Sequence, residues 1–159
     1  MEKNIELQNA WDFVEHTGIS IFLTGKAGTG KTTFLRAIKQ HSTKRMIVVA
    51  PTGVAAINAN GVTIHSFFQL PLSPFVPESM VKPRFEYSKQ KRQIMRTLDL
   101  LIIDEISMVR ADILDAIDSI LRRFREHNKP FGGVQLLMIV LNYELLFNFC
   151  LVDARGVGI

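Results

Sequence analysis

Short apolar runs alternate along this chain with stretches in which apolar residues recur every three or four positions. The runs are typical of buried strands and lie at residues 19–23, 45–50, 98–104 and 134–140. Helical spacing separates them, over residues 5–14, 31–40, 54–58, 87–97 and 110–125. Strands that alternate with helices favour a mostly parallel sheet flanked by helices, with right-handed crossovers. The pattern predicts an α/β domain.

The segments between these elements are less regular. Asn60 and Gly61 predict a turn, followed by a short strand or extended piece at residues 62–64. Residues 68–84 contain four prolines and no sustained period, which predicts a long surface loop. A Gly132-Gly133 turn leads into the strand at 134–140.

Composition narrows the class of protein. The chain has 159 residues, of which 47% are hydrophobic and 21% charged, so it can form one globular domain with a real core. Its net charge of +4 favours anionic partners slightly. The basic clusters at 89–96 and 122–125 fit either a phosphate-tracking surface or an ordinary solvated helix face. A single cysteine, Cys150, rules out a disulfide framework. Residues 1–11 lack a signal-peptide core, and we expect a cytoplasmic location, nucleoid-associated if the source is prokaryotic.

A glycine-rich stretch joins the first strand to the next helix. It has the G-x-x-x-x-G-K-T spacing of a P-loop, which predicts a nucleotide site formed by Gly25, Lys26, Ala27, Gly28, Thr29, Gly30, Lys31, Thr32 and Thr33. Glycines let the backbone N–H groups wrap a polyphosphate, and the helix N-terminus adds partial positive charge. Lys31 reaches the β- and γ-phosphates, and the Thr32 hydroxyl is suited to Mg²⁺. The alternative is a glycine-rich turn without function.

An acidic pair follows the most apolar strand. Asp104 is placed to hold Mg²⁺, directly or through water, and Glu105 to polarise the attacking water. Both stand at the carboxyl edge of a predicted parallel sheet, where ligands bind in open α/β folds. The alternative is a pair of acids that caps the next helix. Ser107 fits either coupling to a neighbouring loop or a helix N-cap.

Three further segments carry a resemblance to a known family. The sequence Thr-Gly-Val-Ala-Ala at 52–56, Thr-Ile-His-Ser-Phe at 63–67 and Asp-Glu-Ile-Ser-Met at 104–108 resemble the PIF-type (petite integration frequency) DNA helicases. These are superfamily 1B enzymes related to the RecD subunit. Gln8, seventeen positions before Gly25, matches the glutamine with which this family reads adenine. The resemblance covers residues 5–139.

The resemblance implies a RecA-like P-loop NTPase domain that uses ATP and Mg²⁺ to move 5′ to 3′ on single-stranded DNA. By the same resemblance Lys31 and Glu105 are the catalytic residues, and Thr32 and Asp104 hold the metal. The implied DNA contacts are Pro51, Thr52, Gly53, His65, Ser66 and Phe67. Core packing remains open for Phe67 and Phe68, and a buried structural role remains open for His65.

The likeness ends after the fourth strand. The family continues with a Gly-Asp-x-x-Gln-Leu-x-Pro segment that residues 140–145 do not contain, and its second motor domain, with the arginine finger, has no counterpart here. We therefore expect a first motor domain at 1–140, incomplete at the C-terminus, and an unmatched apolar tail at 141–159. Our hypothesis is that a frame change or truncation replaced the family sequence from Val140 onward, which sequencing the source gene tests.

Residues 134–152 are nearly long and apolar enough to span a membrane, but four polar residues make an aggregation-prone tail the better prediction. Three functions remain open at this point. They are the ATPase domain of a 5′-to-3′ helicase, a nucleotide-holding fragment without turnover, and another P-loop enzyme such as an AAA-type ATPase or a kinase. The segments at 52–56 and 63–67 argue against the third.

Overall fold

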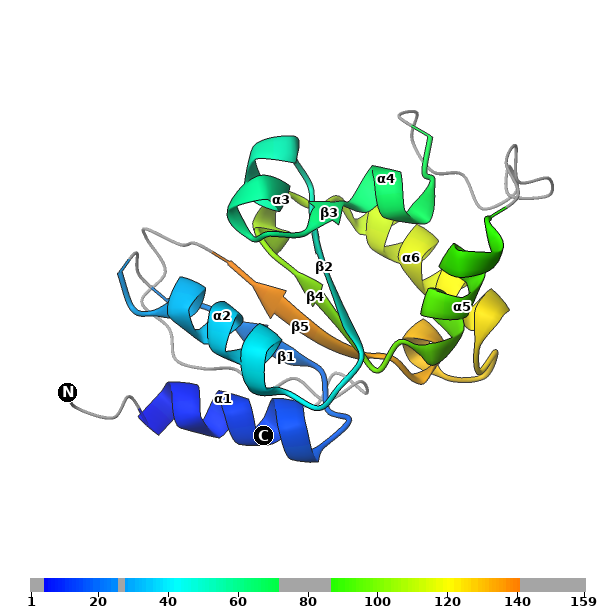
Figure 1. Cartoon of the computed structure of the whole chain (residues 1–159). Coiled ribbons are helices and arrows are strands. Elements are labelled where there is room, and N and C mark those ends of the chain that lie inside the picture. Colours follow the sequence, from blue (N-terminus) through cyan, green and yellow to red (C-terminus); the bar gives the residue numbers. More distant parts are fainter. Residues whose placement is uncertain (1–4, 26–27, 72–86, 141–159) are drawn as a thin grey trace.

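A parallel sheet forms the centre of the protein. The computed structural model describes residues 5–25, 28–71 and 87–140. Its five strands lie in the order β1-β5-β4-β2-β3, and every neighbouring pair is parallel (Figure 1). They are β1 (Ile21–Leu23), β2 (Met46–Ala50), β3 (Val62–Thr63), β4 (Leu100–Ile103) and β5 (Gln135–Ile139). The predicted parallel α/β fold is confirmed.

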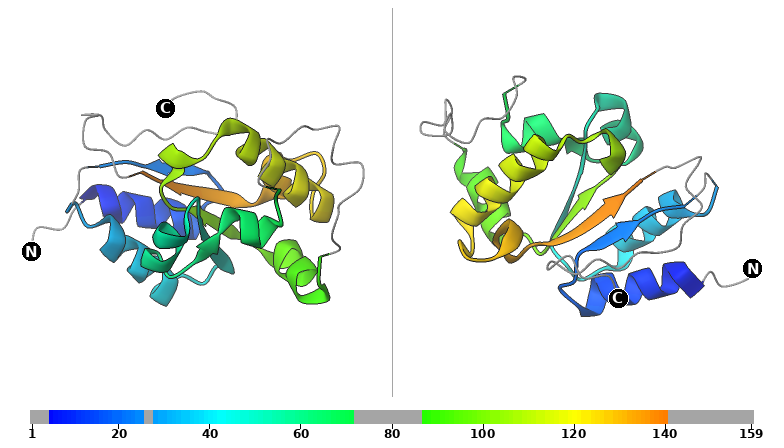
Figure 2. Two further views of the ribbon diagram at one scale, coloured as in Figure 1. Left: turned by 90° about the horizontal axis from the view of Figure 1, so that it is seen from above. Right: turned by 180° about the vertical axis from the view of Figure 1, so that it is seen from behind.

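Helices cover both faces of the sheet (Figures 1 and 2). They are α1 (Ile5–His16), α2 (Lys31–His41), α3 (Gly53–Asn58), α4 (Ile64–Phe68), α5 (Lys89–Thr97) and α6 (Ala111–Phe124), with 3₁₀ turns η2 (Ile106–Met108) and η3 (Pro130–Gly133). Strand β4 shows why both layers are needed. Leu100 and Ile102 pack with α1 and α2, whereas Leu101 and Ile103 pack with α4, α5 and α6. Burial on both faces explains the continuous apolar run.

Residues 64–68 differ from the prediction. They form the helix α4, and the extended piece is limited to the two residues of β3. The cause is local, because the Thr63 hydroxyl accepts a hydrogen bond from Ser66 N at 3.2 Å and caps the new helix. The predicted loop at 68–84 therefore starts later, after Gln69 with its left-handed backbone. Its remainder, from residue 72, lies outside the described residues.

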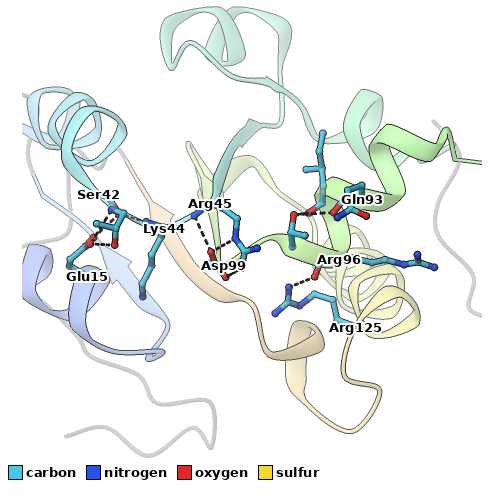
Figure 3. Close-up of polar contacts among 11 residues, drawn as sticks. Glu15, Ser42, Lys44, Arg45, Gln93, Arg96, Asp99 and Arg125 are labelled. Carbon is cyan, nitrogen blue, oxygen red and sulfur yellow. Dashed lines mark hydrogen bonds and ion pairs between the residues drawn. The ribbon is translucent and has the colours of Figure 1, made fainter.

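Helix α1 is fastened to the turn that follows α2 (Figure 3). Ser42 Oγ donates to Glu15 Oε2 at 2.6 Å, and Thr43 donates to Glu15 Oε1 through its hydroxyl at 2.6 Å and its backbone N–H at 3.0 Å. These hydrogen bonds lower the pKa of Glu15 to about 2. At the other end of α1, Leu7 Cδ1 would lie 3.3 Å from a Cβ on Gly30. The two helices therefore run side by side from the P-loop to this turn.

The parallel arrangement brings several loops to one edge of the sheet. The P-loop follows β1, Pro51 follows β2 and Asp104 follows β4. Strand β5 lies between β1 and β4, with Leu23 opposite Ile139 and Ile103 opposite Met138. Two strand spacings correspond to ~10 Å, a span that a nucleotide with its metal can bridge. In the part of the chain that the structure describes, no helix is long and apolar enough to cross a membrane.

Candidate nucleotide and nucleic-acid sites

The P-loop leads directly from β1 into α2. Gly28 and Gly30 have φ of +83° and +90°, a backbone conformation that residues with a side chain rarely adopt. Helix α2 then begins at Lys31, and its first N–H groups face the loop. Thr32 and Thr33 are exposed at this end of the helix. Lys26 and Ala27 fall outside the described residues.

Lys31 is the most buried charged residue of the loop, with 6% of its surface exposed. Its ammonium group donates to the Gly25 carbonyl oxygen and to Thr29 Oγ1, the latter at 3.1 Å. Burial lowers the pKa of this ammonium group, because removal from water disfavours the charged form. A Cβ on Gly25 would lie 3.0 Å from Thr29 Oγ1, so glycine leaves room for this arrangement. The loop holds a cation where phosphate oxygens are expected to bind.

Asp104 stands at the end of β4 and is partly buried. Its N–H donates to Val49 O at 2.9 Å, and its Oδ1 accepts from Glu105 N at 3.0 Å. Burial raises the pKa of the Asp104 carboxyl, and the hydrogen bond from Glu105 N lowers it by less. A carboxylate held at such a cost in desolvation is typical of functional sites.

The backbone of Glu105 is the unusual feature of the acidic pair. It has φ 54° and ψ 45°, in the left-handed region that a non-glycine residue seldom occupies. This conformation turns the chain out of β4 and into η2 directly after the carboxylate of Asp104. Strained conformations of this kind cluster at active sites. The sequence carries no sign of it, because glutamate has no preference for this region.

Replacing Asp104 by asparagine is expected to stabilise the protein at neutral pH. The raised pKa means that the folded state binds the proton more tightly than the unfolded chain, whose aspartates titrate near 3.8. The folded state therefore loses stability as the pH rises through the raised pKa, and at pH 7 this cost is fully present. Asparagine keeps the oxygen that accepts from Glu105 N and carries no charge. Thermal unfolding should give a higher Tm for Asp104→Asn at pH 7 and no difference near pH 3.

The donor set fits magnesium. Among the described residues no three His, Cys, Asp or Glu side chains come together to hold a metal on their own. Thr32 and Asp104 offer one hydroxyl and one carboxylate at the same edge of the sheet. Mg²⁺ is usually held by one or two protein oxygens together with phosphates and waters, so two ligands suffice.

Gln8 lies on α1, on the side of the molecule that carries the P-loop. It is exposed and donates to Asp12 Oδ1 at 3.3 Å, a weak contact that a ligand can replace. Its neighbour Leu7 lies against Gly30. The structure thus places Gln8 near the P-loop, as a role in binding the base requires.

The segments proposed to contact DNA meet at a separate cleft of about 330 Å³. One wall comes from the β2–α3 loop and α4, the other from the chain between η2 and α6, and its lining includes Pro51, Thr52, His65, Met108, Arg110 and Asp112. Thr52 also caps α3, since its hydroxyl accepts from Ala55 N at 3.2 Å. Gly53 and Ser66 are exposed close by in the sequence. Arg110 was not singled out from the sequence.

Phe67 does not offer a face to a ligand in this structure. Its side chain is 4% exposed, and its ring packs edge-on against Phe68 with centroids 4.8 Å apart. The structure therefore favours core packing for both phenylalanines. Ser107 lies within η2, and Arg110 precedes α6, so Ser107 is not the N-cap of that helix.

Several cations of the two basic clusters are bound to the protein itself. Lys91 Nζ donates to Ser66 O at 2.7 Å, Arg122 pairs with Asp118 at 2.7 Å, and Arg125 Nη1 donates to Arg96 O at 2.8 Å. The last of these joins α6 to α5 (Figure 3). These contacts favour a structural role for Lys91, Arg122 and Arg125.

A P-loop on β1 and an acidic pair on β4, both at the carboxyl edge of one parallel sheet, define a P-loop NTPase domain. The family can be stated as well, because the model of the PIF1-like helicases matches residues 4–140. This chain belongs to the PIF1-like helicase family.

The relatives support this assignment. The chain is 38% identical over 150 residues to the ATP-dependent DNA helicase PIF1 of Candida albicans, which covers 90% of this chain and 16% of that relative. Among solved structures, Bacteroides Pif1 bound to ssDNA gives a TM-score of 0.80 at 46% identity. The Bacteroides helicase in complex with ADP-AlF3 and ssDNA gives 0.81 at 46% identity. The match covers 91% of this chain and 33% of each of these two chains, so the chain spans about a third of their length.

Proposed function

We propose that this chain is the nucleotide-binding first motor domain of a 5′-to-3′ DNA helicase that binds ATP with Mg²⁺ and acts on single-stranded DNA. One observation carries the proposal. Lys31 and Thr32 follow β1, Asp104 and Glu105 follow β4, and both pairs stand at the same edge of the sheet on either side of β5. The direction of movement rests on the family alone.

Each residue of the nucleotide site then has a role. Lys31 exchanges its bonds to Gly25 O and Thr29 Oγ1 for oxygens of the β- and γ-phosphates. The Thr32 hydroxyl and the Asp104 carboxylate hold Mg²⁺, which neutralises phosphate charge when bound. Glu105 orients the attacking water and accepts its proton. Gln8 bonds the edge of the adenine.

The second site binds the DNA backbone. Pro51, Thr52, Gly53, His65 and Ser66 lie along or beside the cleft between the β2–α3 loop, α4 and the start of α6. Hydroxyl and backbone N–H groups bind phosphate without reading the base sequence, which suits a motor that moves along a strand.

A second candidate function is nucleotide binding without turnover. The observation that favours it is the match to only a third of the solved relatives' length. In P-loop enzymes an arginine finger contributes about 10³–10⁵ in rate, and the family carries its finger in the second motor domain. A first domain by itself would then bind Mg·ATP and hydrolyse it very slowly.

Binding and turnover of Mg·ATP, measured with and without single-stranded DNA, separate the two functions. For the motor domain we expect DNA-stimulated turnover that Glu105→Gln lowers by about 100-fold or more while Mg·ATP binding is retained. Glu126→Gln is the matched control, since Glu126 pairs with Lys129 beyond α6. Binding without turnover supports the second function, and a chain that does not bind Mg·ATP contradicts both.

A further inference from the structure

We propose that Arg110 is a phosphate-binding residue of the cleft, held by Asp112 until a single strand of nucleic acid replaces that carboxylate. The inference rests on the proposed DNA-binding function and adds a residue to it. Arg110 directly precedes α6 and lines the cleft together with Thr52 and His65. Its side chain is 64% exposed, so the guanidinium group is accessible to a ligand.

The contact with Asp112 has the geometry that a phosphate would reproduce. Arg110 Nε donates to Asp112 Oδ1 at 3.0 Å, and Nη2 donates to Oδ2 at 2.9 Å. A guanidinium fork binds two oxygens of a carboxylate or of a phosphate in the same way. Exposed ion pairs of this kind contribute little to stability, so the exchange of one anion for the other costs little.

The rest of the cleft suits the sugar and base that accompany a phosphate. Ile64, Val109 and Ile113 supply apolar lining, and Met108, 58% exposed, adds apolar surface next to Arg110. The Thr52 hydroxyl accepts from Ala55 N and keeps its own hydrogen for donation. A single strand exposes its bases, and it therefore fits a surface that combines a cation, a hydroxyl and apolar side chains better than a duplex does.

The protein offers a matched control at the opposite edge of the sheet. Arg45 binds Asp99 with the same two-pronged geometry, Nε to Oδ2 at 2.7 Å and Nη2 to Oδ1 at 2.8 Å (Figure 3). Its side chain is 63% exposed, against 64% for Arg110. Arg45 precedes β2 and Asp99 precedes β4, so this pair lies at the amino end of the strands, away from the cleft. Arg45→Ala removes the same charge from the wrong place.

The test is the binding of a fluorescent oligothymidylate to the whole chain, followed over a range of salt concentrations. We expect Arg110→Ala to weaken binding about tenfold at low salt and to reduce the slope of log K against log salt by about 0.7, the value for one contact with a single strand. Asp112→Asn should strengthen binding severalfold, because the arginine no longer has a competing anion. Arg45→Ala should leave the affinity within twofold of the wild type.

The outcomes separate this inference from the proposed function. If the wild type binds the oligonucleotide and Arg110→Ala behaves as Arg45→Ala does, the inference is overturned and the proposed function stands. If the wild type does not bind, the proposed DNA partner is wrong and the inference falls with it. Arg110→Lys guards against loss of the helix start, because it keeps the charge without the fork. An affinity between those of the wild type and Arg110→Ala, with an unchanged Tm, supports the inference, and an affinity equal to that of the wild type contradicts the fork geometry.

Discussion

Lys31→Ala is expected to weaken Mg·ATP binding by about 100-fold without lowering the stability of the protein. Hydrogen bonds to charged partners contribute about 1.5–3 kcal/mol each, and the ammonium group at the centre of the P-loop is placed to make more than one with phosphate oxygens. The folded protein gains little from the same charge, because burial disfavours it, as its lowered pKa shows. Alanine also favours the helix that begins at this position.

Isothermal titration calorimetry measures the affinity, and thermal unfolding without nucleotide measures the stability. Lys39→Ala is the reciprocal control on the same helix. Lys39 Nζ donates to Ala59 O at 3.2 Å and to Asn60 O at 2.6 Å, contacts that hold the turn before β3. Its removal should lower Tm and leave Mg·ATP affinity unchanged. Equal affinity in Lys31→Ala and the wild type would mean that the triphosphate does not lie in this loop.

The sequence was sufficient for the parts of the fold that depend on a local period or a fixed spacing. The strand at Leu100–Ile103 is apolar at every position because helices cover both its faces, and such a run is visible without a structure. The P-loop and the acidic pair were likewise predicted from spacing, and the parallel sheet brings them to one edge. Their roles in catalysis remain predictions.

Other features depend on one side chain or on distant partners, which no period reveals. Helix α4 exists because the hydroxyl of Thr63 caps it, and a run of five residues is too short to show a helical repeat. Arg110 gained its interest from Pro51, Thr52 and His65, which lie about half the described chain away in sequence and across one cleft in space. The family motifs end at Met108, so they gave no reason to examine the next two residues.

Gln135 is the clearest case of a residue whose importance the sequence concealed. It appeared there only as a polar interruption in the strand at 134–140. In the structure it is 2% exposed, and its amide nitrogen donates to Phe13 O at 3.1 Å and to Ile19 O at 2.7 Å. Its Oε1 accepts from Lys44 Nζ at 2.6 Å, and the same ammonium group donates to Thr17 O at 2.6 Å. One side chain thus joins β5 to α1, to the start of β1 and to the turn before β2.

Gln135→Leu is therefore expected to lower the free energy of unfolding by about 3 kcal/mol, although leucine has nearly the same size and is more apolar. The substitution leaves Phe13 O and Ile19 O without their amide donor, and Lys44 Nζ without its side-chain acceptor. A buried polar group that loses its partner costs about 1–3 kcal/mol. Urea unfolding measures the change. The double variant Gln135→Leu with Lys44→Met should lose less than the sum of the two single variants, because it removes both ends of one hydrogen bond. Strict additivity within about 0.5 kcal/mol would show that Gln135 and Lys44 do not stabilise each other.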